Sequence, residues 1–263
     1  MEYFEWNVSP ILLSLGGFSI HWYGALFAAA ILSGFGVMNR IYKHENKSIE
    51  TLESLQIYMV IGIVIGARLG HCLFYDPVYY FSNPLKILAI NEGGLASHGG
   101  GIGAILATLY YAKKNTINFI YLLDRLAIPT ALFAFFVRMG NLMNSEILGI
   151  QTDVPWAIVF SRVDLIPRHP AQLYEAIAYL SIFIVLSLVY IFKNEKIKAG
   201  FLFGLFLSLI FTARIAVEFV KERQASYSEG IIFSTGQMLS VPFLLLGLAL
   251  IILSFYKKEE FKV

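Results

Sequence analysis

The chain has 263 residues, of which 57% are hydrophobic and 14% are charged. A soluble domain usually holds about 45–50% apolar and about 25% charged residues, so this composition, with a mean hydropathy of +0.67, excludes an ordinary soluble protein. The net charge of +2 is too small for electrostatic binding of nucleic acid. The single cysteine, Cys72, excludes an intramolecular disulfide, a multi-cysteine zinc site and an iron–sulfur cluster. A polytopic membrane protein remains.

Stretches that lack Asp, Glu, Lys and Arg locate the expected membrane spans. A helix needs about 20 residues to cross the hydrocarbon core. We therefore expect an all-α polytopic membrane protein with seven transmembrane helices, near 18–39, 55–75, 95–112, 118–139, 172–192, 200–220 and 236–256. No repeat or linker divides the chain, so we expect one integral membrane domain, 1–263. The connection near 140–171 is rich in Asn, Asp, Pro and Arg, which predicts an ordered extramembrane segment on the external side.

Basic residues outside these spans indicate the orientation of the chain. With the N-terminus outside and the C-terminus in the cytoplasm, eleven basic residues are cytoplasmic and five are external. The cytoplasmic set is Arg40, Lys43, Lys47, Lys113, Lys114, Lys193, Lys196, Lys198, Lys257, Lys258 and Lys262, and the external set is Lys86, Arg162, Arg168, Lys221 and Arg223. No basic segment precedes the first apolar stretch, so we expect no cleaved signal peptide.

Four arginines, Arg68, Arg125, Arg138 and Arg214, remain inside or at the ends of predicted spans. An arginine at the bilayer centre costs at least about 2.5–3.5 kcal/mol, so each needs an explanation. One explanation is internal pairing, since Arg214 and Glu218 are four residues apart and share a helix face. Function is the other, and for Arg68 and Arg125 both stay open. Arg68 can also extend its head group to the membrane interface.

Arg138 precedes Asn141, Glu146 and Gly149 at the point where the apolar character of the fourth predicted span stops. A guanidinium group can bind phosphate through two parallel hydrogen bonds, and the amide and the carboxylate complement it at headgroup depth. The alternative is a helix C-cap at Gly140 and Asn141. A cap explains two of these residues, but not the arginine, asparagine and glutamate together.

His98 lies in a stretch, 93–103, that has six glycines in eleven residues. Glycines let membrane helices approach closely, and histidine exchanges a proton near neutral pH. The alternative is a histidine that only packs between helices. On the expected topology Tyr23, His98, Arg138 and Arg214 fall in the outer half of the bilayer on four helices, which favours chemistry on an anionic lipid headgroup. For Tyr23, an aromatic membrane anchor is the alternative.

Six motifs follow one another along the chain, and together they are specific although each is weak alone. They are His-Trp-Tyr-Gly from His21, Gly-Gly-x-x-x-His-Gly-Gly from Gly93, Arg-x-Gly-Asn-x-x-Asn-x-Glu-x-x-Gly from Arg138, Arg-His-Pro-x-Gln-Leu-Tyr-Glu from Arg168, Arg-Ile-x-Val-Glu-Phe from Arg214, and Gly-Gln-x-Leu-Ser-x-Pro from Gly236. In this order they resemble the motifs of prolipoprotein diacylglyceryl transferases.

The resemblance implies a multi-pass enzyme of the bacterial inner, or cytoplasmic, membrane whose active site faces the outer leaflet. Its reaction would transfer the diacylglyceryl group of phosphatidylglycerol to the lipobox cysteine thiol of a prolipoprotein. A thioether forms and glycerol phosphate leaves, as the first step of lipoprotein maturation. The expected partners are phosphatidylglycerol, prolipoprotein signal peptides with a lipobox cysteine, and the lipid bilayer. We expect no nucleic acid, no cofactor and no metal.

The resemblance also implies roles for single residues. As catalytic residues, His98 would take the thiol proton, Arg138 would bind the phosphate, and Arg214 would stabilise it or position the cysteine segment. The expected substrate-binding residues are Arg138, Asn141, Glu146, Gly149, Tyr23 and Glu218, of which the last two would orient the arginines. Leu148 and Ile210 replace aromatic residues that are common in the family, which affects secondary contacts.

Three other classes compete with this interpretation. A transporter or channel for a small anionic solute would use intramembrane charges along its path, but here the polar groups gather at one half of the bilayer and no two halves repeat. A serine hydrolase is disfavoured because no nucleophile elbow occurs. An intramembrane metalloprotease is disfavoured because His-Glu-x-x-His is missing.

Overall fold

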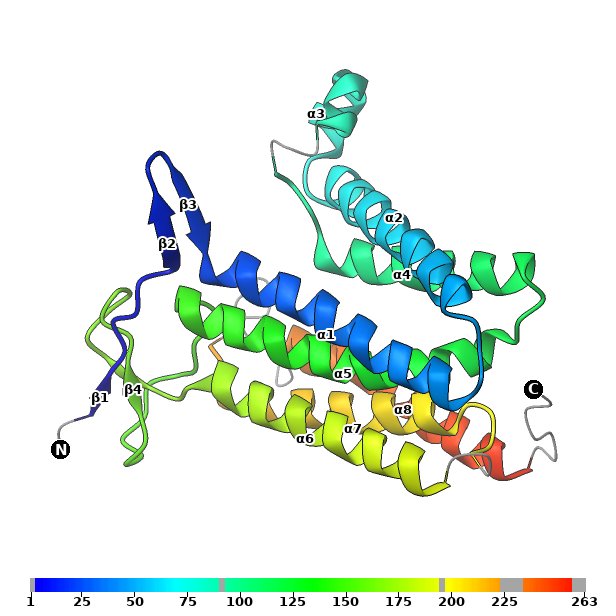
Figure 1. The fold of residues 1–263 in the computed structure, drawn as a ribbon. Helices are drawn as coiled ribbons and strands as arrows, with labels where there is room; N and C mark the ends of the chain where they lie inside the picture. Colours follow the sequence, from blue (N-terminus) through cyan, green and yellow to red (C-terminus); the bar gives the residue numbers. More distant parts are fainter. Residues whose placement is uncertain (1–2, 90–92, 194–196, 223–233, 257–263) are drawn as a thin grey trace. The chain divides into compact units, whose positions relative to one another are not determined.

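The computed structural model describes residues 3–89, 93–193, 197–222 and 234–256. The chain folds into two compact units, one of residues 1–38 and 123–263 and the other of residues 39–122. Helices α1 (Trp22–His44) and α5 (Phe119–Asn144) pass from one unit into the other (Figure 1).

Six helices among the described residues are long and apolar enough to cross a membrane, which confirms a polytopic membrane protein. They are α1, α2 (Ile49–Phe74), α5, α6 (Ala171–Lys193), α7 (Phe201–Glu218) and α8 (Thr235–Tyr256). The helix α4 (Ser97–Lys114) corresponds to the third of the seven predicted spans, near 95–112. It is not one of the six, since it contains four glycines and ends in two lysines. Two short helices, α3 (Pro77–Ser82) and the 3₁₀ helix η1 (Pro84–Leu88), follow α2.

The prediction of an all-α chain misses two small sheets. Residues Phe18–His21, placed in the first helix by their apolar character, form strand β3, which pairs antiparallel with β2 (Ile11–Leu15). Short apolar runs fit strands and helices alike, and here Gly16, at φ +61°, permits the tight turn between the two strands. The helix α1 therefore begins at Trp22.

The second sheet joins β1, near the start of the chain, to the segment between α5 and α6. Its strand order is β1 (Phe4–Glu5), β4 (Ile158–Val159) and β5 (Pro167–Arg168), with β1 parallel to β4. Next to β1, the Trp6 indole donates to the Leu142 carbonyl over 3.1 Å. The indole packs against a buried apolar cluster of Leu142, Leu148, Ile158 and Phe160.

Helix α8 has the residue distribution of a helix surrounded by lipid. Its buried residues are small or polar, namely Gln237, Ser240, Gly247 and Ser254. Its exposed residues are large and apolar, and include Met238, Leu239, Phe243, Leu245 and Phe255. Water would make this arrangement unfavourable, because exposed apolar surface costs about 25 cal/mol per Å². The pattern follows naturally when the solvent is hydrocarbon.

Two of the charges in predicted spans serve the fold. Asp124 of α5 is fully buried and accepts hydrogen bonds from the N–H groups of Gly200 and Phe203, both at 2.8 Å. These donors belong to the start of α7, where backbone N–H groups lack partners within the helix and a negative charge is favoured. Nearby on α5, Arg125 is buried with its guanidinium carbon 5.8 Å from the ring centroid of Tyr190.

Arg68 of α2 binds backbone carbonyls and is 4% exposed. Its guanidinium donates to the carbonyl oxygens of Ile87 at 2.8 Å, Lys86 at 2.5 Å and Gly93 at 2.6 Å. These contacts satisfy carbonyl groups in the connection between α2 and α4. Of the three explanations for this arginine, the structure therefore supports internal partners, which are backbone carbonyl groups.

Glycines bring α2 and α4 into backbone contact. Gly62, Gly66 and Gly70 of α2 face Gly99 and Gly103 of α4. A Cβ atom on Gly103 would lie 2.8 Å from the carbonyl carbon of Gly62 and 3.1 Å from the Cα of Gly66. Small residues at this spacing allow the dispersion contacts that drive helix association in membranes.

We expect Gly103→Ala to destabilise the protein by about 1–3 kcal/mol, because the added methyl group meets backbone that cannot move aside. The matched control is Gly101→Ala in the same helix, where a Cβ meets no atom within 4 Å. Alanine there should stabilise the helix by up to about 1 kcal/mol. Thermal unfolding in detergent measures both, and equal midpoints for the two variants would contradict the packing argument.

Candidate functional site

Arg138 pairs with a buried carboxylate on the neighbouring helix. Its Nε lies 2.9 Å from Oε2 of Glu175 on α6, and the Glu175 side chain is 1% exposed. Its Nη1 donates to Oδ1 of Asn141 over 3.2 Å, and its guanidinium carbon lies 5.9 Å from the ring centroid of Tyr179. These contacts fix the position of the guanidinium between α5 and α6.

The alternative of a helix C-cap at Gly140 and Asn141 is wrong, because α5 continues to Asn144. Arg138 and Asn141 are three residues apart within this helix and therefore share a face. Gly140 serves packing, since a Cβ there would lie 2.8 Å from Cδ2 of Tyr23. Tyr23 of α1 thus packs directly on the α5 backbone beside Arg138 and Asn141.

Glu146 follows the end of α5, and its side chain reaches back to the helix face that carries Arg138 and Asn141. Ser145 and Ile147 have φ angles of +55° and +60°, in the left-handed region that ends many helices. This turn lets Oε2 of Glu146 accept from Nδ2 of Asn141 at 3.2 Å. The Gln172 amide of α6 donates to the Glu146 carbonyl over 2.5 Å and holds the turn in place.

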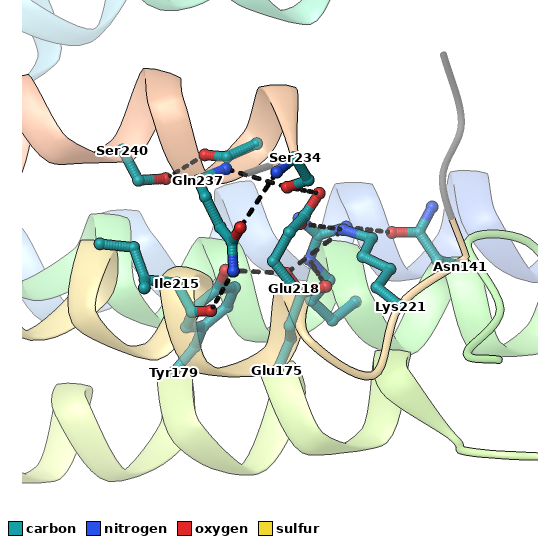
Figure 2. Close-up of polar contacts among 11 residues, drawn as sticks. Asn141, Glu175, Tyr179, Ile215, Glu218, Lys221, Ser234, Gln237 and Ser240 are labelled. Atoms are coloured by element: carbon teal, nitrogen blue, oxygen red, sulfur yellow. Dashed lines mark hydrogen bonds and ion pairs between the residues drawn. The ribbon is translucent and has the colours of Figure 1, made fainter. Parts of the chain in front are cut away.

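Lys221 connects the carboxylates of two helices (Figure 2). Its Nζ lies 3.6 Å from Oε1 of Glu175 and 3.8 Å from Oε2 of Glu218 on α7. The other oxygen of Glu218 accepts from the Ser234 hydroxyl at 2.9 Å. Glu218 is therefore part of the polar cluster that contains Arg138.

Among the described residues, Arg214 does not form the suggested ion pair with Glu218. Lys221 forms an ion pair with Glu218 instead. The charge of Arg214 nevertheless reaches the cluster. Burial lowers the pKa of Lys221, Glu175 opposes this effect, and the positive charges of Arg138 and Arg214 add to it. Arg214 therefore lies close enough to Lys221 to act on it electrostatically.

Gly149 allows two chain segments to meet. It forms a β-bridge with Lys221, and its N–H donates to the His169 carbonyl over 3.1 Å. A Cβ atom there would lie 2.7 Å from the Val220 carbonyl oxygen and 2.6 Å from Cβ of His169. The adjacent Leu148 is buried in the apolar cluster around Trp6.

His98 belongs to the other unit, residues 39–122, where it lies in the first turn of α4. Its imidazole is exposed. It stacks on Tyr75 with ring centroids 6.0 Å apart and meets Phe74 edge-on at 6.3 Å. The N–H of Ala96 donates to the Ala67 carbonyl over 2.9 Å and anchors the start of α4 to α2.

Of the predicted site residues, one unit therefore holds Tyr23, Arg138, Asn141, Glu146, Gly149, Arg214 and Glu218. Sequence reasoning missed Glu175 and Lys221 as members. Glu175 is the last residue of the motif that begins at Arg168, but the sequence did not predict its pairing with Arg138. Lys221 was counted only as an external basic residue. Across the described ranges, no three His, Cys, Asp or Glu side chains are grouped so that they could hold a metal ion.

Arg168 supports the segment between α5 and α6 that carries Gly149. Its Nη2 lies 2.7 Å from Oδ2 of Asp164, and its Nη1 donates to the Gly149 carbonyl over 3.2 Å. The hydrogen bond from Arg168 holds the pKa of the Asp164 carboxyl below its ordinary value of 3.8. Nη1 also lies 3.4 Å from a carboxylate oxygen of Glu222.

Comparison with known proteins gives a consistent result. Residues 10–253 match the family model described as prolipoprotein diacylglyceryl transferase. A protein of Tolumonas auensis is 52% identical over 97% of this chain and 99% of its own length. Proteins of Chloroherpeton thalassium and Bacteroides fragilis are 46% and 44% identical, covering 95% and 97% of this chain and 94% and 96% of their own lengths. All three are named phosphatidylglycerol–prolipoprotein diacylglyceryl transferase.

We expect the segment between α5 and α6, which contains Asp164 and Arg168, to lose stability in acid. The Asp164 carboxylate binds Arg168 only when ionised, so its contribution is complete above pH 3.8 and is lost as the pH falls through the lowered pKa. Asp164→Asn should remove this contribution, about 1 kcal/mol or less for a partly exposed pair. Unfolding midpoints at pH 6 and pH 3 test it against Asp153→Asn, an exposed aspartate of the same segment. An equal acid dependence in both variants would contradict it.

Proposed function

The chain belongs to the prolipoprotein diacylglyceryl transferase family, and from this premise we propose that it transfers diacylglyceryl from phosphatidylglycerol to a prolipoprotein lipobox cysteine. The observation that carries the proposal is the match across residues 10–253 together with near-complete relatives of the same name. These relatives favour a transferase over the transporter or channel that we considered as the alternative. The polar cluster around Arg138 fits the anionic headgroup of such a lipid.

Arg138 is the proposed phosphate ligand. Glu175 holds it at Nε and Asn141 holds it at Nη1, so the guanidinium is held in one orientation. A guanidinium that is fixed in advance needs no reorganisation when charge develops on the leaving group. Phosphatidylglycerol carries one negative charge on its phosphodiester, and the released glycerol phosphate carries one more. The arginine therefore stabilises the transition state more than the bound lipid.

His98 is the proposed base. The thiol of the lipobox cysteine gives its proton to the imidazole, and the thiolate, the stronger nucleophile, attacks the glyceryl carbon next to the phosphate. A carbon–sulfur bond forms, the carbon–oxygen bond to phosphate breaks, and glycerol phosphate leaves with the electron pair. The exposed position of His98 in the first turn of α4 supports access by a substrate.

The remaining roles follow from the cluster. Arg214 adds positive charge that stabilises the leaving phosphate or positions the cysteine segment. Asn141 and Glu146, joined at 3.2 Å, shape the glycerol side of the headgroup site. Tyr23 and Glu218 orient the arginines. Gly149 contributes through the close approach of chain segments that it allows.

We further propose seven spans, with α4 as the third, an external N-terminus and a cytoplasmic C-terminus. The chain would form one integral membrane domain with the extramembrane segment near 140–171 outside. The basic last turns of α1, α4 and α6 support this orientation, since each carries lysine. The bacterial relatives support the cytoplasmic membrane as the location, and the site would then face the outer leaflet.

The transferase assay mixes purified protein with phosphatidylglycerol vesicles and a lipobox peptide and follows the release of glycerol phosphate. We expect Arg138→Ala to lower the rate about 10²- to 10³-fold, because a preformed electrostatic donor is lost. His98→Ala should lower it about 10²- to 10⁴-fold, as expected for a general base. Arg162→Ala, an exposed external arginine, is the control. Full release by the Arg138 and His98 variants would refute the assigned roles.

Cysteine labelling tests the orientation. In a Cys72→Ser background, Arg162→Cys should react with a membrane-impermeant maleimide in intact spheroplasts, whereas Lys114→Cys should react only after lysis. The opposite pattern, or labelling of both before lysis, would show that the proposed orientation is wrong.

A further inference from the structure

Lys221 is a buried cation at the centre of the polar cluster. Its side chain is 8% exposed, and its ammonium lies 3.6 Å from Glu175 and 3.8 Å from Glu218. Glu175 in turn holds Arg138 at 2.9 Å. One ammonium group therefore links the carboxylate that orients Arg138 with a carboxylate on α7.

The backbone around Lys221 is held on both sides. Lys221 forms a β-bridge with Gly149, the N–H of Glu222 donates to the Leu148 carbonyl at 3.0 Å, and the N–H of Ile150 donates to the Val220 carbonyl at 2.9 Å. These contacts begin two residues after α7 ends, at Val220, so the Lys221 side chain leaves from a fixed point. Such a fixed origin is what a residue that positions another group requires.

The charges of the cluster balance only when Lys221 is included. Among the described residues, three cations and three carboxylates meet there, namely Arg138, Arg214, Lys221, Glu146, Glu175 and Glu218. Without the lysine the carboxylates outnumber the cations, and an anionic headgroup would be repelled. A carboxylate left without one of its partners in a buried site is also strongly unfavourable.

We propose that Lys221 is a positioning residue, which bridges Glu175 and Glu218 and thereby keeps Glu175 on Arg138 with the guanidinium turned to the lipid phosphate. This inference rests on the proposed function for its lipid substrate. The ammonium acts through Glu175, so its loss affects binding of the anionic headgroup before it affects the chemical step.

Titration supports the same role. Burial lowers the pKa of Lys221, so this lysine loses its charge at a lower pH than an exposed lysine. As the pH rises, the KM for phosphatidylglycerol should therefore increase. Among the described residues, the charged groups that act on Lys221 are Glu175 of α6, Arg138 of α5, and Arg214 and Glu218 of α7. The Tyr179 hydroxyl donates to Glu175 beside them.

The experiment compares Lys221→Met, Lys221→Arg and wild type in the glycerol phosphate assay, with phosphatidylglycerol varied at saturating peptide. Lys221→Met should raise the KM for the lipid about tenfold or more with a smaller change in kcat, which corresponds to at least one lost charge contact. Lys221→Arg should keep the KM within about threefold, and its alkaline rise in KM should shift to higher pH because arginine stays charged. Tyr179 is common to both proteins, so the shift reports on residue 221.

Lys43→Met, an exposed lysine on α1, is the control and should match wild type. An unchanged KM in Lys221→Met, or a KM in Lys221→Arg as high as in Lys221→Met, would overturn the proposal. If Lys221→Met does not fold, Lys221→Arg decides through its KM and its pH profile.

Failure of the proposed function is distinguishable from failure of this inference. If wild type releases no glycerol phosphate, the proposed function is wrong. Calorimetric binding of a short-chain phosphatidylglycerol then still compares wild type with Lys221→Met. A dissociation constant about tenfold higher in the variant would support the role of Lys221, and equal constants would overturn it.

Discussion

The ion pair between Arg138 and Glu175 is the interaction on which the site depends. It joins α5 to α6 at 2.9 Å with the carboxylate almost completely buried. A buried ion pair is not a strong source of stability, because desolvation offsets most of the attraction. Its role is geometric, because moving either side chain away would leave the other as a buried charge without a partner. The pair therefore holds a guanidinium at one place and one orientation, as an anion site requires.

The same rule governs the other charges inside the protein. Asp124 is satisfied by the first N–H groups of α7, and Arg68 is satisfied by carbonyl groups after α2. Both charges are used by the fold, and no substrate is needed to explain them. In the cluster around Arg138 the charges instead meet one another, across three helices and the residues after α7. This pairing of side-chain charges with one another separates the cluster from the structural charges.

Glycines allow chain segments to approach closely at two places in the protein. Glycines of α2 and α4 bring the two helix backbones together. Gly149 lets the segment between α5 and α6 pass beside Lys221. In the first case the gain is dispersion contact within the membrane. In the second it is the fixed placement of a buried lysine. The amino-acid type is the same, and the surroundings determine its role.

The order of the amino acids predicted the membrane environment, the approximate spans and the motif residues that line the cluster, such as Arg138, Asn141 and Glu146. These properties are local, since apolar length and the residues of one helical turn follow from neighbours along the chain. The hairpin at Phe18, the continuation of α5 beyond Gly140, and the partners of Arg138 were not predicted. Glu175 and Lys221 lie far from Arg138 in sequence, and their meeting depends on how α5, α6 and α7 pack. Which charge compensates which is a question of three-dimensional distance, and only the folded chain answers it.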